Sequence, residues 1–373
     1  MRKESTKMNL EHTFCPNSAC ADRGKIGQGN IGVHSMKEQR CICHTCGKTF
    51  SITKGTALYR LKKPTALVVT VITLLAYGCP VPAIVAAFGL DARTVRDWLR
   101  RAGEHGSDVH THLVERAKLN LQQVQADEIK VKTQRGNFWM AMAMMVPTRL
   151  WLGGVVSPRR DLKLIRALIE KVCGIARCRP LLFLVDGLAS YVKAVQHAFR
   201  SPLRTGKVGR PRLIPWPDIA IAQVVKRRTS DGLHITRRIV QGCPEMIRHL
   251  LGRHTINTAY IERLNATFRQ RLACLARRTR ALARTAAPLT HGMFLVGCVY
   301  NFCTDHHSLR CPLYVGRSGR VHWVQRTPAM AAQLTDHRWS VGELLAFKVP
   351  PSPFVPPKRR GRPPKRVLLE AAA

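Results

Sequence analysis

The stretch Leu181-Leu-Phe-Leu-Val-Asp186 is a run of five apolar residues that ends in a carboxylate. A short apolar run without polar alternation is typical of a strand that is buried on both faces of a sheet. The residues before it, Asp161–Ala176, have the apolar spacing of a helix, and Tyr191–Phe199 is expected to form another helix after it. A buried strand between two helices indicates a layered α/β domain.

Three further strands are expected upstream of this run. Gln123–Lys132 alternates polar and apolar residues, Phe138–Val146 is apolar throughout, and Leu150–Val156 is a third candidate. Three consecutive strands, a helix, a buried strand and a second helix form the order of a ribonuclease-H-like α/β core. The sequence therefore predicts such a core over residues 121–310.

Acidic residues occupy defined places in this order. Asp127 lies midway along the first strand, Asp186 ends the fourth, and Glu262 belongs to a later helix. The first and fourth strands are neighbours in such a core, so their carboxylates are expected to lie close together, and Glu262 is expected to join them. Three carboxylates in one site suit two Mg²⁺ or Mn²⁺ ions, which can activate a water or a 3′-hydroxyl for phosphoryl transfer.

Each of these acids also has an ordinary explanation. Glu128 would point to the face of the strand opposite Asp127, and one of the two could be a surface residue. Asp186 precedes a glycine, which is a common pair in turns. Glu262 could be an ion-pair neighbour of Arg269 without a catalytic role. The three acids carry a functional argument only as an ordered set on the expected elements.

The charge of the chain indicates a polyanionic partner. The chain has 61 lysines and arginines against 22 aspartates and glutamates, a formal net charge of +39 and a pI near 10.9. Basic residues occur in every segment, so DNA or another nucleic acid is the simplest partner. A protein of the ribosomal type or one that binds a membrane surface would share this charge, so charge alone does not name an activity.

Residues 257–278, NTAYIERLNATFRQRLACLARR, are expected to form the helix that carries Glu262. This single acid stands among arginines, of which Arg263, Arg269 and Arg271 are candidates to hold DNA. An apolar stripe with helical spacing is expected to face the core. It consists of Ile261, Leu264, Phe268, Leu272 and Leu275.

A cytoplasmic location is expected, without a membrane span. Residues 1–11 are charged and lack the apolar segment of a secretory signal. Ala66–Leu90 carries no charge, but threonine, glycine and proline residues interrupt it, which argues against a membrane-spanning helix. Thirteen cysteines, an odd number, favour reduced thiols, some of them holding metal, over a disulfide scaffold.

Two close cysteine pairs near the start of the chain predict a structural zinc site. Cys15 and Cys20 form the first pair, and Cys43 and Cys46 form the second after a glycine-rich segment. Four thiolates with this spacing are typical of a zinc ribbon, in which an enclosed Zn²⁺ holds the fold. Competing ligands are Cys41, His34 and His44. The alternative is a small hairpin domain with reduced, unliganded thiols.

A basic helix-turn-helix is expected after the cysteines. Pro64–Tyr77, Val81–Phe88 and Ala92–Ala102 have helical character, with a tight turn at 89–91 before the third helix. A short helix, a glycine-containing turn and a basic second helix form an arrangement that reads DNA. The arginines expected to face outward are Arg93, Arg96 and Arg100. The alternative is a basic helical hairpin without this role.

Several segments resemble the transposases of bacterial insertion sequences of the insertion-sequence-one type. They are IERLNATFRQRLACLARRTRA at 261–281, the cysteine motif RCICHTCGKTFS, the helix-turn-helix, QADEI and LVDG, and the resemblance covers residues 12–305. It implies a nucleoid-associated DDE transposase with a ribonuclease-H-like fold. Such enzymes bind terminal inverted repeats and cleave and join DNA strands with Mg²⁺, without a covalent enzyme intermediate. A homo-oligomer on paired DNA ends is expected.

The resemblance also implies roles for particular residues. Asp127, Asp186 and Glu262 become the metal ligands. The residues expected beside them are Asn257, Asn265 and Arg269.

Two segments depart from the family pattern: a basic insertion, and the chain after Leu309, which extends past the usual end of the family. Leu203–Trp216 is an insertion that contains Arg210 and is expected to form a loop on DNA. The C-terminal tail, residues 350–373, is proline-rich and basic and is expected to be disordered. Arg360 and Arg362 flank a glycine as in an AT-hook, which enters the minor groove. The alternative is a polybasic tail that binds phosphates without groove preference.

The sequence thus predicts a multi-domain transposase. The alternatives are a DNA-binding regulator derived from an inactive transposase and a structure-selective nuclease of the same fold. The expected domains are a zinc ribbon (1–60), a helix-turn-helix domain (61–105), a linker (106–120), a catalytic domain (121–310), a C-terminal extension (311–349) and the basic tail (350–373).

Overall fold

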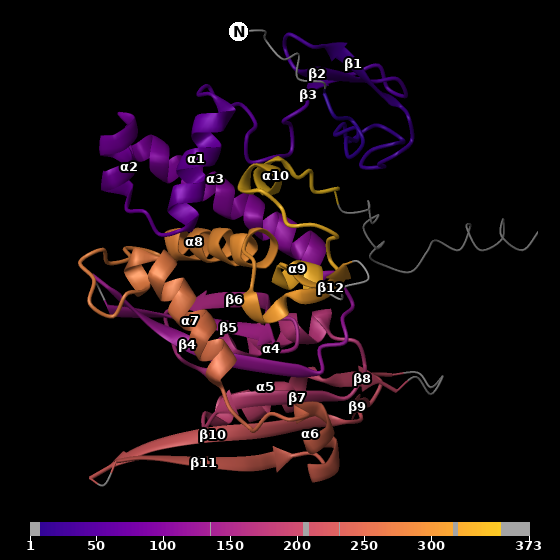
Figure 1. The fold of residues 1–373 in the computed structure, drawn as a ribbon. Helices are drawn as coiled ribbons and strands as arrows, with labels where there is room; N and C mark the ends of the chain where they lie inside the picture. The colour runs from indigo at the N-terminus through magenta and orange to yellow at the C-terminus, as the bar shows by residue number, and fades with distance from the viewer. Residues whose placement is uncertain (1–7, 135, 204–208, 231, 316–319, 352–373) are drawn as a thin grey trace, which may run out of the picture. The chain divides into compact units, whose positions relative to one another are not determined.

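The chain folds into two compact units. One comprises Met1–Ile52 together with Pro350–Ala373, and the other comprises Thr53–Val349. Figure 1 follows both along the chain. The computed structural model describes residues 8–134, 136–203, 209–230, 232–315 and 320–351.

The first unit contains a small antiparallel sheet. Its strands are β1 (Ile31–Ser35), β2 (Arg40–Cys43) and β3 (Thr49–Ser51), in the order β1-β2-β3. Because side chains alternate along a strand, Cys41 and Cys43 of β2 both turn inward and are buried. Cysteines therefore make up most of the buried cluster of this unit.

Three helices open the second unit, as the sequence predicts. They are α1 (Thr65–Ala76), α2 (Val81–Phe88) and α3 (Ala92–His110). Asp91 caps α3, because its carboxylate accepts a hydrogen bond of 2.6 Å from the backbone N–H of Arg93. Among the described residues, no helix has both the length and the apolar character needed to cross a membrane.

The predicted linker over residues 106–120 is wrong, because much of it is helical. α3 continues into it and is followed by a π-helical turn, η1 (Thr111–Glu115). α3 packs along α8 (Ala286–Cys298). Gly103 allows this close approach, since a Cβ atom there would lie 2.4 Å from the backbone oxygen of His291. The segment is rich in charged residues and histidine, which suggested a linker, but part of it belongs to a helix that packs on α8.

A mixed sheet of six strands, in the order β11-β10-β7-β4-β5-β6, forms the centre of this α/β unit. β4, β5 and β6 pair antiparallel, whereas β7 pairs parallel with both β4 and β10. The four predicted strands are confirmed, and the hairpin of β10 and β11 is an addition to them. The strands are β4 (Gln123–Thr133), β5 (Gly136–Met145), β6 (Leu150–Ser157), β7 (Leu181–Asp186), β10 (Ile219–Thr229) and β11 (Gly232–Gln241).

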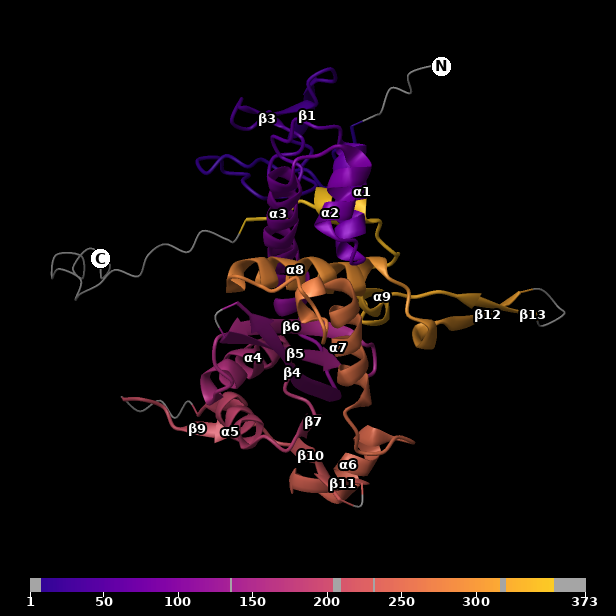
Figure 2. The same ribbon diagram turned by 90° about the vertical axis from the view of Figure 1, so that its left-hand side faces the viewer.

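Helices cover both faces of this sheet (Figure 2). They are α4 (Leu162–Ile175), α5 (Ala189–Ala198), α6 (Pro244–Leu251) and α7 (Ala259–Arg271), together with α8. α4 and α5 share a buried cluster with Ala126 of β4, whereas α7 and α8 share another with Ile129. Because side chains alternate along β4, Asp127 lies on the same face as Ile129 and looks toward α7.

The helix that carries Glu262 is shorter than predicted. α7 ends at Arg271, and Leu272 has an extended backbone with φ −119° and ψ 105°. A 3₁₀ turn, η2 (Ala273–Leu275), follows. Most of the predicted apolar stripe is nevertheless buried, at Ile261, Leu264, Phe268 and Leu275.

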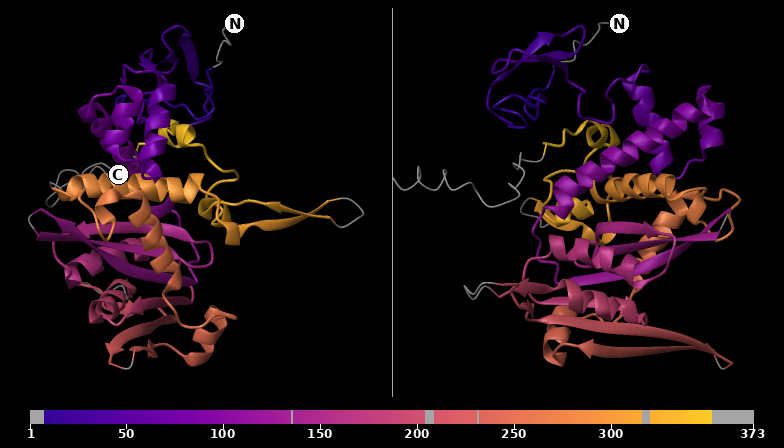
Figure 3. Two further views of the ribbon diagram at one scale, coloured as in Figure 1. Left: turned by 60° about the vertical axis from the view of Figure 1, so that its left-hand side comes forward. Right: turned by 180° about the vertical axis from the view of Figure 1, so that it is seen from behind.

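Segments predicted as a loop and an extension contain regular structure. β9 (Leu213–Pro215), at the end of the basic insertion, pairs with β8 (Arg200–Pro202), so the segment expected to form a loop ends in a short strand, and its contact with DNA stays a prediction. The hairpin of β12 and β13 projects from the rest of the second unit (Figure 3). The C-terminal extension consists of β12 (Cys311–Val315), β13 (Arg320–Val324), α9 (Pro328–Ala331) and α10 (Val341–Ala346).

Part of the C-terminal extension belongs to the core of the second unit, since α10 packs against α1 and α3. Residues 352–373 lie outside the described residues. The disordered tail and the AT-hook at Arg360 and Arg362 therefore stay predictions.

Candidate active site and metal centres

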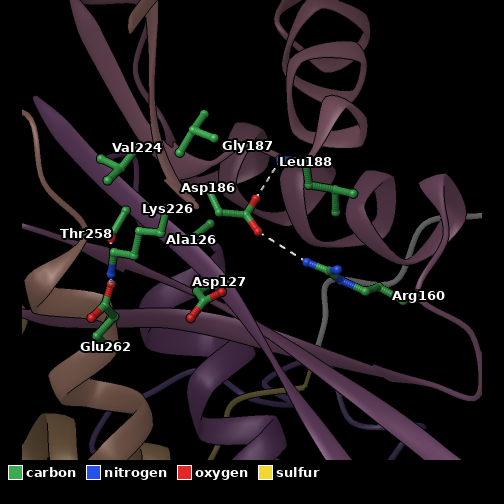
Figure 4. Close-up of a pocket in the computed structure, with 11 residues that line it drawn as sticks. Ala126, Asp127, Arg160, Asp186, Gly187, Leu188, Val224, Lys226, Thr258 and Glu262 are labelled. Atoms are coloured by element: carbon green, nitrogen blue, oxygen red, sulfur yellow. Dashed lines mark hydrogen bonds and ion pairs between the residues drawn. The ribbon is translucent and has the colours of Figure 1, made fainter. Parts of the chain in front are cut away.

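A cavity of about 450 Å³ lies where β4 and β7 separate. β4 pairs with β7 only from Gln123 to Gln125, so the two strands diverge just before Asp127. Asp186 ends β7, and Glu262 belongs to the first turn of α7. All three acids line this cavity, and in Figure 4 Asp127 lies between Asp186 and Glu262.

Asp127 is the most buried acid of this set. The side-chain amide of Asn265 donates a hydrogen bond of 2.8 Å to its Oδ2, so one predicted helper residue contacts the site. Burial raises the pKa of Asp127 to about 6, and the negative charges of Glu128, Asp186 and Glu262 act in the same direction. Crowded carboxylates of this kind would be stabilised by a cation.

Asp186 is held by its own turn and by an arginine. Its Oδ1 accepts a hydrogen bond of 3.0 Å from the backbone N–H of Leu188, at the start of α5. Its Oδ2 accepts one of 3.2 Å from the guanidinium of Arg160 (Figure 4). The turn chemistry considered for this residue is therefore present, on a side chain that also faces the cavity.

Glu262 is an ion-pair partner, but of Lys226 on β10 and not of Arg269. Its Oε1 accepts hydrogen bonds of 2.5 Å from the Lys226 ammonium and 2.7 Å from the Thr258 hydroxyl. Partial burial opposes ionisation of Glu262, and these two hydrogen bonds outweigh it, so the pKa lies below its usual value. Lys226 and Thr258 were not predicted. The sequence does not show which residues of β10 face α7, because that depends on how β10 pairs with β7.

Glu128 points away from α7, as alternation along β4 predicts. Its side chain is fully buried, so it is not a surface residue. One carboxylate oxygen accepts a hydrogen bond of 2.7 Å from the hydroxyl of Tyr191 on α5, and the other accepts from Arg160. Arg160 therefore bridges Glu128 and Asp186.

Three acids are close enough to share a metal ion. Asp127, Glu128 and Asp186 can each offer one carboxylate oxygen, and these atoms lie within 4.8 Å of one another. Hard oxygen ligands of this kind fit Mg²⁺ or Mn²⁺. The group found among the described residues thus contains two predicted ligands and Glu128, whereas Glu262 lies at the cavity in its ion pair with Lys226.

Gln125 fixes the start of α7 over the sheet. This side chain is fully buried on β4, two residues before Asp127. Its Nε2 donates 2.8 Å to the carbonyl of Asn257, and its Oε1 accepts 2.9 Å from the N–H of Ile261. Asn257, a predicted helper, forms no hydrogen bond with the acids; its carbonyl accepts from Gln125, and its Oδ1 accepts 3.0 Å from the N–H of Ala259. Sequence reasoning missed Gln125, because a polar residue on an alternating strand looks solvent-facing.

The α7 arginines that were predicted to contact DNA lie in two different environments. Burial and the neighbouring Arg277 lower the pKa of Arg269, whereas the nearby negative charge of Asp127 acts in the opposite direction. Arg263 and Arg271 instead line a second cavity. The structure therefore separates residues that the sequence treats as one basic clamp.

The other predicted arginines differ in their freedom to bind DNA. Arg93 and Arg96 are exposed on α3, and Arg210 is exposed in the insertion. Arg100 is exposed too, but its guanidinium forms ion pairs of 2.7 Å with both Asp97 and Glu104. The charge of Arg100 is thus largely balanced within α3.

The four predicted thiols form a compact cluster in the first unit and could hold zinc. The sulfur atoms of Cys15, Cys20, Cys43 and Cys46 lie within 4.8 Å of one another, with 3.7 Å between Cys15 and Cys46. Burial raises the pKa of Cys15 to about 12, whereas the backbone N–H of Lys48 lowers that of Cys46 to about 6. Among the described residues, this four-sulfur group does not include the competing candidates Cys41, His34 and His44.

A scan against models of protein families gave no match, and a search of curated proteins gave no significant match.

Proposed function

We propose that this protein is a metal-dependent DNA transposase of the DDE type with a ribonuclease-H-like catalytic core. The observation that carries the proposal is the cavity shared by Asp127, Asp186 and Glu262, which come from three separate elements. The strand order supports it, with three antiparallel strands and a parallel strand beside the first of them. The net charge of +39 suits a protein that holds DNA at an acidic site.

In this proposal Asp127, Asp186 and Glu262 hold divalent cations, and Glu128 is the adjacent acid. When bound, such cations activate the attacking water or 3′-hydroxyl and stabilise the leaving oxygen of the phosphodiester. The donor set fits them, because all three ligands are carboxylates, and burial together with the neighbouring negative charges raises the pKa of Asp127.

Neighbouring side chains position the acids and balance their charge. Asn265 donates to Asp127, Arg160 donates to Asp186, and Lys226 donates to Glu262. Arg160 and Lys226 both line the cavity. Each can therefore offer its positive charge to a phosphate of the strand that enters it.

The remaining parts of the chain would bring DNA to this site. The helices α1 to α3, with exposed Arg93 and Arg96, and the cysteine unit with bound zinc would bind the terminal inverted repeats. Two or more copies on paired ends would complete the assembly. The tail would add salt-sensitive affinity without sequence preference.

A strand-transfer assay tests the proposal. Purified full-length protein is mixed with labelled DNA ends that carry the inverted repeats flanking the gene, a target plasmid and Mg²⁺. Joining of the labelled end to the target is expected. Hydrolysis without joining would indicate a nuclease instead, and binding of the ends with neither reaction would indicate a regulator.

Substitution separates chemistry from DNA binding. Asp127→Ala, Asp186→Ala and Glu262→Ala are each expected to abolish cleavage and to leave end binding intact. Asp336→Ala, at a carboxylate that is 93% exposed, is the matched control and should change neither. Activity that survives all three substitutions would overturn the site assignment.

A further inference from the structure

A second cavity, of about 600 Å³, is lined by a different set of α7 residues. Tyr260, Arg263 and Arg271 contribute from α7, Tyr77 from the end of α1, and Arg149 from the turn between β5 and β6. None of these five residues lines the carboxylate cavity. We call this second cavity the basic pocket.

The basic pocket carries positive charge that no carboxylate balances. Arg149, Arg263 and Arg271 take part in none of the ion pairs found in the described part of the chain. The acid at the pocket wall, Asp305, is held by Arg338 at 2.7 Å. Three guanidinium groups therefore share one cavity without a counter-charge of their own.

Two of these guanidinium groups are fixed in place. Arg149 lies 3.7 Å above the ring of Tyr260, and Arg271 lies 4.5 Å above the ring of Tyr77. Arg149 Nε and Arg271 Nη1 are buried donors for which the described structure contains no hydrogen-bond acceptor. Buried N–H groups without an acceptor are costly, and a bound anion would satisfy them.

The backbone of Arg149 adopts a conformation that is unusual for an arginine. Its φ of 59° lies in the left-handed region, which favours glycine or asparagine. An arginine held there, with its guanidinium directed onto Tyr260, places a charge at the pocket wall at some conformational cost. His306, also in the pocket wall, has a lowered pKa because of burial and the nearby Arg149 and Arg263.

We propose that the basic pocket binds a backbone phosphate of DNA, at a site separate from the carboxylate cavity. A phosphate fits better than a base, because a guanidinium group already occupies one face of each of the Tyr77 and Tyr260 rings, and three arginines offer hydrogen-bond donors and charge to an anion. The inference rests on the proposed function only in taking DNA as the partner.

A phosphate in the basic pocket would connect the three N-terminal helices to the catalytic helix. The turn after α1 lies directly on the end of α7, since a Cβ atom on Gly78 would lie 2.8 Å from the backbone oxygen of Gln270. Tyr77 and Arg271, which meet at this contact, both line the pocket. DNA held here would therefore contact both parts of the second unit at once.

The salt dependence of DNA binding tests the inference. Full-length wild-type protein, Arg263→Gln and Arg149→Gln are titrated onto a fluorescein-labelled duplex of random sequence, without added Mg²⁺ or chelator, over a series of KCl concentrations. Loss of one phosphate contact should reduce the slope of log K against log [KCl] by about 0.9 in each variant. Arg263 is exposed, so its substitution is expected to leave the fold intact. The matched control is Arg166→Gln, at an exposed position of α4, which should keep the wild-type slope.

An unchanged slope in both variants would overturn the inference. A small phosphate compound is the other possible ligand of the pocket. Binding of inorganic pyrophosphate, measured as a thermal shift of the protein, tests for it. Stabilisation by pyrophosphate that is lost in Arg263→Gln, together with an unchanged DNA slope, would assign the pocket to a small phosphate compound and would also overturn it. Because omission of Mg²⁺ removes metal-dependent cleavage from the measurement, failure of the proposed catalytic function would be seen separately, in the strand-transfer assay.

Discussion

The two candidate metal centres of this protein are assembled in opposite ways. The thiols come from two close pairs, Cys15 with Cys20 and Cys43 with Cys46, and each pair is brought together by a short segment of chain. The carboxylates come from β4, β7 and α7, and only the sheet and the packing of α7 bring them to one cavity. Local spacing predicts the four thiols of the first site, with Cys41, His34 and His44 left as competing ligands, whereas the second site is predictable only as acids on expected elements.

The two sites also differ in what depends on them. The buried cluster of the first unit consists of Phe50 and four cysteines, three of which belong to the four-thiol group, so removal of a metal would remove most of what holds this unit together. The second unit has large buried clusters on both faces of its sheet. Its carboxylates can therefore be changed without loss of the fold.

Removal of zinc should have the largest effect. Structural zinc contributes on the order of 10 kcal/mol to the folding of small modules. Cys20→Ser, or treatment of the wild type with a zinc chelator, is expected to make the first unit sensitive to protease while the second unit stays folded. Limited proteolysis with mass spectrometry measures this. Cys178→Ser, at an exposed thiol of the second unit, is the control. A first unit that resists protease without zinc would contradict the contrast between the two sites.

Neutralising one acid at a time should decide which carboxylate completes the second site. Glu262→Gln is expected to slow cleavage by about 10²-fold or more, or roughly 3 kcal/mol in the barrier. Glu128→Gln should retain cleavage, because its carboxylate is held by Tyr191 and Arg160 on the far face of β4. Single-turnover cleavage with saturating Mg²⁺ measures both. The reverse result would make Glu128 the third ligand, in agreement with the group of closest oxygens.

Gln125 provides a test of how packing assembles the site. Gln125→Leu leaves the Ile261 N–H and the Asn257 carbonyl without partners and should lower the free energy of unfolding by roughly 2 to 4 kcal/mol. Cleavage should fall as well, since α7 carries Glu262. Urea denaturation measures the stability. Gln196→Leu, at an exposed glutamine, should cost less than about 0.5 kcal/mol. Equal effects of the two changes would show that Gln125 does not fix α7.

The smallest effect should be the pH dependence due to Asp127. Its pKa is raised from 3.8 to about 6, so the folded state binds this proton more tightly than the unfolded state. The resulting stabilisation is complete below pH 3.8 and is lost as the pH rises through 6. Without added Mg²⁺, Asp127→Asn should therefore gain Tm relative to the wild type across this range, and Mg²⁺ should reduce the difference. Thermal melts from pH 4 to 8 measure it, and Asp336→Asn should show no such gain.

The secondary structure around the site was predictable in large part. The apolar run at β7, the spacing along α4 and the alternation along β4 each have one dominant pattern, and all three elements are confirmed. The prediction of a linker was wrong because the charged residues of this segment lie beside a small number of buried residues of α3, the helix that packs on α8. The end of α7 was overestimated because helical spacing of apolar residues continues beyond Arg271, although the backbone does not.

By itself the sequence determined the four-thiol cluster, the order of the core strands and the placing of Asp127, Asp186 and Glu262 on separate elements. These follow from local spacing and from periodicity, which act within a few residues of chain. Only the tertiary structure decided that Glu262 pairs with Lys226, that Glu128 is buried against Tyr191, and that Arg263 and Arg271 line a cavity other than that of Glu262. Those outcomes depend on strand register and on which buried polar groups find partners across the fold, and neither quantity can be read from neighbouring residues.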